Sequence, residues 1–114
     1  VAVANTFGNA AAIDCVKNSA FGTTGSYTLT PNVDAPVQRQ AGALTGNIIV
    51  DMASSNVPDG AYFKIIRTGS GASTFTVNMT GGGGSATLTQ NQYLDTMFSA
   101  QAGAWIPISK GSIV

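Results

Sequence analysis

The 114-residue chain contains no histidine, no glutamate and only one cysteine. Histidine is the commonest general base and the commonest metal ligand in proteins, so its absence removes catalytic triads that use imidazole. A single cysteine, Cys15, cannot form an internal disulfide, which excludes a disulfide-stapled secreted scaffold. The composition therefore argues against most hydrolases and against cysteine-rich extracellular domains.

Charge is also scarce, because charged residues make up 9% of the chain and the formal net charge is zero. Nucleic-acid binding needs clustered cations, whereas the lysines and arginines here are scattered among small polar residues. No stretch approaches the 18 apolar residues of a membrane span. We therefore expect neither a nucleic-acid nor a membrane partner. Net charge normally keeps small domains apart, so the sequence predicts that copies of the chain or other proteins cover part of its surface.

The remaining carboxylates form no pattern that is typical of catalysis or metal binding. A glycosidase would need two of them facing each other across a cleft. Asp59, however, lies in a Pro-Asp-Gly turn, and Asp51 points outward from an amphipathic strand. The glycine run at 81–84 is not followed by the Lys-Ser/Thr pair that a phosphate-binding loop requires. We predict a protein that is not an enzyme, with no catalytic residue, no metal site and no cofactor.

The chain divides into two parts by composition. Residues 1–42 are rich in small residues and contain Pro31 and Pro36, which predicts an N-terminal arm and loop region with one short edge strand over 26–30. Residues 43–114 hold most of the large apolar side chains and are the expected β-sandwich core. The start at Val1 fits removal of an initiator methionine, and it fits equally a domain cleaved from a longer protein.

Apolar and polar residues alternate with a period of two from Gly46 onward, which indicates strands. The expected strands cover 47–52, 61–68, 74–79, 86–89, 93–98 and 105–108, and Pro107 places the last of them at an edge or a bulge. Short strands without a crossover helix predict an all-β, antiparallel sandwich or barrel, jelly-roll-like, and exclude a parallel α/β architecture. The side chains predicted to point inward are Ile48, Val50, Phe63, Ile65, Phe75, Val77, Leu94, Phe98 and Ile106.

Three aromatic residues are candidates for exposed contacts. Tyr62, Tyr93 and Trp105 would form a stacking platform for a sugar if their rings faced solvent beside Asp and Asn side chains. Packing in the core or at an interface is the more common use of such residues. A carbohydrate-binding module therefore remains the third functional hypothesis.

Short segments between residues 46 and 108 form a recognisable set. They are Val57-Pro58-Asp59-Gly60, the strand from Tyr62 to Arg67, the Gly-Ser-Gly-Ala turn, Phe75-Thr76-Val77-Asn78, and Ala102-Gly103-Ala104-Trp105. With these segments, the region 46–108 resembles the small β-domains of tailed-bacteriophage virion appendages: capsid decoration or cement proteins, head fibres, and the tips of tail fibres and tail needles. The resemblance implies a structural role on the virion, commonly as a homotrimer, without catalysis or a cofactor.

Two roles within this group compete. A cement protein clamps neighbouring capsid subunits, whereas the tip of a tail fibre or needle binds a receptor on the host. The chain has no heptads or triple-β repeats of a fibrous stem, which favours a cement protein on the outer surface of the capsid, assembled in the host cytoplasm. Its partners would be further copies of itself and the major capsid protein, and Val1, Val3 and Phe7 of the arm would make contacts at a neighbour's sheet edge.

Overall fold

The computed structural model describes residues 21–79 and 84–113, and within these residues it contains strands and no helix. The fold is therefore all-β, as predicted. The strands are β1 (Gly25–Leu29), β2 (Val37–Gln40), β3 (Ile48–Met52), β4 (Tyr62–Arg67), β5 (Phe75–Met79), β6 (Gly84–Thr87), β7 (Gln92–Ser99) and β8 (Ala104–Ser112). The arm residues Val1, Val3 and Phe7 lie outside the described residues.

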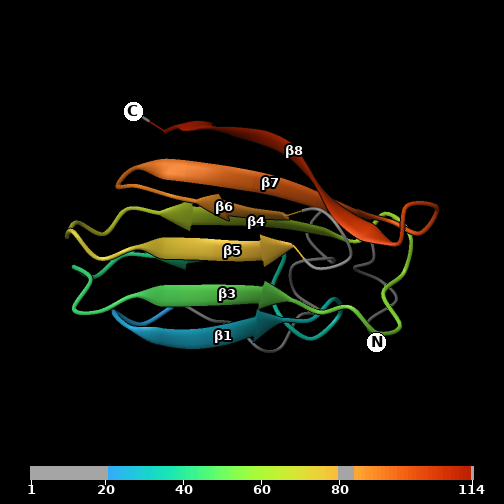
Figure 1. Cartoon of the computed structure of the whole chain (residues 1–114), viewed down its shortest axis with the longest axis horizontal. Helices are drawn as coiled ribbons and strands as arrows, with labels where there is room; N and C mark the ends of the chain where they lie inside the picture. The colour runs from blue at the N-terminus through green and yellow to red at the C-terminus, as the bar shows by residue number, and fades with distance from the viewer. Residues whose placement is uncertain (1–20, 80–83, 114) are drawn as a thin grey trace, which may run out of the picture.

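The strands form two four-stranded sheets (Figure 1). The first sheet has the order β1-β3-β5-β6 and the second sheet has the order β2-β4-β7-β8. The pairs β1–β3, β3–β5 and β2–β4 are parallel, while β4–β7, β5–β6 and β7–β8 are antiparallel. Both sheets are mixed, so the prediction of an antiparallel fold was wrong.

The path of the chain explains the parallel pairs. From β1 to β5, successive strands alternate between the two sheets. Each strand of one sheet therefore serves as the crossover between two strands of the other, the part that a helix usually plays. Figure 1 shows β1, β3 and β5 pointing in the same direction as a result. The sequence-based prediction failed because it assumed that consecutive strands pair as hairpins.

Side chains from both sheets meet in one hydrophobic core. Eight of the nine residues predicted to point inward are buried there, from Ile48 on β3 to Phe98 on β7. Ile106 is the exception, since 37% of it is exposed. It pairs with the outward Met97, while its neighbour Trp105 pairs with the inward Phe98. Opposed residues of an antiparallel pair share a face, so Ile106 points outward and Trp105 fills the core.

The region 21–42 contributes more to this fold than the single strand predicted for it. β1 is an edge strand, as expected, but β2 forms a second edge, and Phe21 and Leu29 belong to the core. β2 escaped detection because its inward side chains are glutamines, Gln38 and Gln40, both fully buried. A polar inner face gives no hydrophobic alternation to recognise.

Proline 107 behaves as its chemistry predicts. β8 is the edge strand of the second sheet, and its register against β7 shifts between Asp95, paired with Ser109, and Thr96, paired with Pro107. Ile108 is the extra residue of this bulge. A bulge and a residue without an amide donor make the open edge a poor template for another strand.

Candidate interaction surface

The outward side chains of the second sheet gather into one surface. On β4 and β7 the alternation that buries Phe63 and Leu94 turns their sequence neighbours toward solvent. The strand register then sets the outward residues side by side. We call this surface the outer face, and it comprises Val37, Tyr62, Lys64, Tyr93, Asp95, Met97, Ile106 and Ser109.

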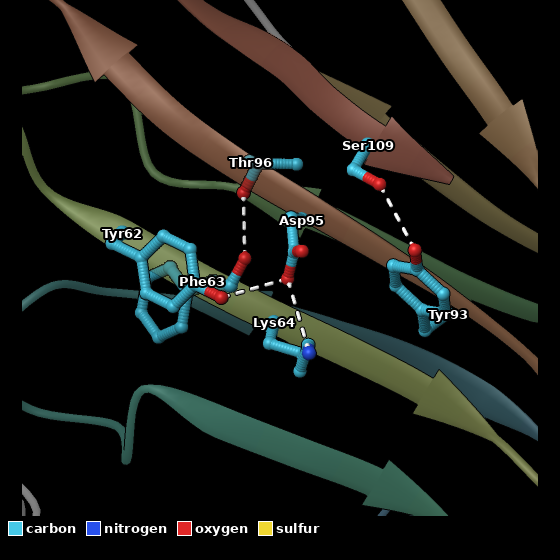
Figure 2. Close-up of polar contacts among 7 residues, drawn as sticks. All are labelled: Tyr62, Phe63, Lys64, Tyr93, Asp95, Thr96 and Ser109. Carbon is cyan, nitrogen blue, oxygen red and sulfur yellow. Dashed lines mark hydrogen bonds and ion pairs between the residues drawn. The ribbon is translucent and has the colours of Figure 1, made fainter. Parts of the chain in front are cut away.

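Asp95 is the centre of a polar network on the outer face (Figure 2). Its Oδ1 accepts a hydrogen bond of 2.7 Å from the Tyr62 hydroxyl, and the same oxygen lies 3.7 Å from Lys64 Nζ. Lys64 Nζ also lies 5.0 Å from the centre of the Tyr93 ring, within the range of a cation–π interaction. The Tyr93 hydroxyl shares a 3.0 Å hydrogen bond with Ser109 Oγ. Three strands are thereby linked across the face.

The network neutralises its own charge. Lys64 lies directly opposite Asp95 in the β4–β7 register, so one cation offsets one carboxylate. Partial burial, the hydrogen bond to Asp95 and the charge of Asp95 together raise the pKa of Tyr62 to about 12. The phenol therefore stays protonated and remains a donor to Asp95 throughout the neutral range.

Apolar side chains surround this network. Met97 lies opposite both Tyr62 and Ile106, and Val37 on the edge strand lies opposite Lys64. Val37, Tyr62, Met97 and Ile106 are all exposed. Contiguous exposed apolar groups with a few polar ones are typical of a surface that binds another protein.

The outer side of the first sheet has a different character. Its outward residues on β3 and β5 include Thr76, Asn78 and Asp51, and the Asn78 amide donates a 2.9 Å hydrogen bond to the Asp51 carboxylate. Ile49 is its large exposed apolar residue. Asp51 and Asp95 thus lie on the outer sides of different sheets and do not form an acid–base pair.

The three aromatic candidates differ in their exposure to solvent. Tyr62 is exposed and Tyr93 is half-buried, and both belong to the outer face. Trp105 is fully buried, and its indole N–H donates a 2.8 Å hydrogen bond to the Ala53 carbonyl, so the suggestion that it is an exposed contact was wrong. Its ring packs in the core against Phe63 and Phe98.

Sequence reasoning missed the apolar members of the outer face. The alternation of β7 did set Met97 on the face opposite Leu94 and Phe98, but its apolar type gave no sign of a contact surface, and Val37 lies on a strand that was not predicted. Ile106 was assigned to the core because of its apolar type. The polarity of Lys64 and Asp95 did indicate the outward direction of their positions, and the register of β4 against β7 supplies the rest.

Within 21–79 and 84–113 there is no cluster of three or more His, Cys, Asp or Glu side chains that would hold a metal ion. The same residues include no helix of the length and apolarity needed to span a membrane. Comparison of the chain with protein-family models, curated proteins and solved structures found no match.

Proposed function

We propose that the chain is a structural protein of a bacterial virus that decorates and cements the exterior of the capsid and has no enzymatic activity. In this proposal it assembles as a homotrimer and contacts the major capsid protein. The fold would serve as a rigid β-sandwich, with the N-terminal arm reaching a neighbouring subunit. The sequence resemblance to phage appendage domains supports the viral assignment.

The outer face is the observation that carries the proposal. The charged residues of this face are Lys64 and Asp95, which offset each other, and the exposed Arg39 lies outside it on the edge strand β2. A paired charge can be covered by another protein without leaving an uncompensated ion, whereas an unpaired charge opposes burial. The exposed apolar side chains around it gain free energy when they leave water. The face is suited to a lasting protein contact.

The open edges of the sheets support the same conclusion. At β8, the bulge and Pro107 hinder strand addition, so uncontrolled edge-to-edge growth is discouraged there. Contact through the outer face is then favoured over contact through this edge. Closed assembly of a few copies gives a defined particle, as a capsid component requires.

Immunogold electron microscopy tests the viral assignment and the site of action together. Antibodies raised against the purified chain would be applied to particles of the virus that encodes it. We expect label distributed over the capsid exterior. Label confined to the fibre or needle tip would replace the cement role with receptor binding, and unlabelled particles would contradict both. Binding of the pure protein to host-surface glycans without particle labelling would instead support a carbohydrate-binding module.

A further inference from the structure

A hollow of about 430 Å³ opens beside the outer face, next to Tyr62. It lies where the end of β1, the start of β2 and the start of β4 come together. Its volume is within the range of cavities that hold small ligands or single side chains. The described residues that line it are Pro31, Asn32, Asp34, Pro36, Val37, Pro58, Ala61, Tyr62 and Phe63. Nothing in the proposed function requires this hollow.

Asp34 is the charged residue among these lining residues, and only 6% of it is exposed. Its Oδ2 accepts a 2.8 Å hydrogen bond from the Thr30 amide, which fixes the carboxylate in place. Oδ1 has no hydrogen-bond or ion-pair partner among the described residues. Asp34 is therefore a nearly buried carboxylate with one oxygen that no described residue engages, and its side of the chain lines the hollow.

The walls around Asp34 are apolar. Pro31, Pro36 and Pro58 supply rigid rings, and Tyr62 and Phe63 supply aromatic surface. A carboxylate in such surroundings is stabilised most by a cation that brings its own apolar stem. The stem contacts the prolines, and the cationic head contacts Oδ1 and the face of an aromatic ring.

The occupancy of the carboxylate favours one kind of cation. The planar fork of arginine gains most when both carboxylate oxygens are free to accept, and the Thr30 amide already takes one of the two acceptor sites on Oδ2. The ammonium group of lysine is a point charge that one oxygen can receive, and its four-carbon stem suits the apolar walls. The chain's own Lys64 is engaged with Asp95. We propose that the hollow is a socket for one lysine side chain presented by a partner protein.

Short peptides test the socket on the full-length protein. The probes are acetyl-Gly-Lys-Gly-amide, its norleucine counterpart, which lacks only the ammonium group, and its arginine counterpart. Binding would be followed by NMR through the amide signals of Thr30, Val37 and Ala61. We expect the lysine peptide to bind about tenfold more tightly than the norleucine peptide, and more tightly than the arginine peptide. Equal binding of lysine and norleucine peptides, tighter binding of arginine, or no shift at the lysine peptide's solubility limit would each overturn the proposal.

Asp34→Asn provides the matched variant. The amide oxygen of asparagine keeps an acceptor for Thr30, while the charge at Oδ1 is lost. Its affinity for the lysine peptide should fall to within about twofold of that for norleucine, since only the charged interaction distinguishes the two probes. The exposed Asp59→Asn serves as the control and should bind as the wild type does. Circular dichroism would show that the Asp34→Asn protein is folded. If the folded variant bound the lysine peptide as tightly as the wild type does, the proposal would be wrong.

Discussion

Arg67 donates hydrogen bonds to three main-chain carbonyls, at 2.9 Å to Gly69, 2.8 Å to Leu88 and 2.9 Å to Gly71. The side chain is buried, and this burial lowers the pKa of the guanidinium from its ordinary value. One rigid fork thus ties the β4–β5 connection to the residue that follows β6. The main-chain acceptors take the place of an acidic partner.

Replacing Arg67 by lysine should destabilise the protein by about 2 to 4 kcal/mol, because a single ammonium cannot reach three carbonyls that face a planar group. Urea unfolding followed by tryptophan fluorescence measures the change. Arg39→Lys is the control, since Arg39 is exposed on β2 and its replacement should cost less than about 0.5 kcal/mol. Equal unfolding midpoints for the two variants would refute the bracing role of Arg67.

Tyr62 should ionise at a higher pH in the folded protein than in the unfolded chain. Its pKa is raised to about 12, so between pH 10 and 12 the unfolded chain releases a proton that the folded protein keeps. The stabilisation is fully present below pH 10 and is lost as the pH rises toward 12. Alkaline titration by tyrosinate absorbance should show a late step that is absent in Tyr62→Phe. If Tyr62→Phe retained that step, another tyrosine would be its source.

At the scale of elements, β2 is held by polar groups as well as apolar ones. The Gln40 amide donates to the carbonyls of Gly22 and Gly42, and its oxygen accepts from the Gly69 amide. Gln38 is equally buried, yet among residues 21–79 and 84–113 its amide donates only to the Ala35 carbonyl, and its Oε1 has no partner there. Two glutamines of one strand therefore contribute differently to stability.

Substitution by methionine, which has a similar shape, distinguishes these two residues. Gln40→Met should cost about 2 to 4 kcal/mol, because it leaves buried main-chain groups without partners. Gln38→Met should stay within about 1 kcal/mol of wild type, because it also removes an unsatisfied oxygen from the interior. Thermal unfolding of both variants provides the comparison. A larger loss for Gln38→Met would contradict this account of β2.

The sequence predicts elements best where one face of a strand is apolar and the other polar. Such alternation located β3, β4, β5 and β7 and nearly all of their inward residues. It failed at β2, where glutamines point inward. At β8 it located the strand and the irregularity at Pro107, but it gave the wrong direction for Ile106. Of the outer face, Tyr62 and Tyr93 were recognised as aromatic candidates, but the apolar members depend on strand pairing.

At the scale of the whole molecule, pairing between strands distant in sequence was the part that local patterns did not reveal. Alternation fixes which side of a strand is buried, but it carries no information on which strands become neighbours. The crossing of the chain between sheets, and hence the parallel pairs, follows from the shared core. The outer face exists only because β4, β7 and β8 are adjacent in the second sheet.

Sedimentation velocity of the purified protein tests the central claim, that the chain assembles with itself through the outer face. We expect a trimer for the wild type and a monomer for Met97→Lys, since an unpaired charge at the centre of a contact opposes its burial. Ile49→Lys is the matched control, because Ile49 is 40% exposed and Met97 is 39% exposed, but Ile49 lies on the first sheet. It should sediment as the wild type does. A wild type that remains monomeric at every concentration, or an Ile49→Lys protein that dissociates as Met97→Lys does, would contradict the account.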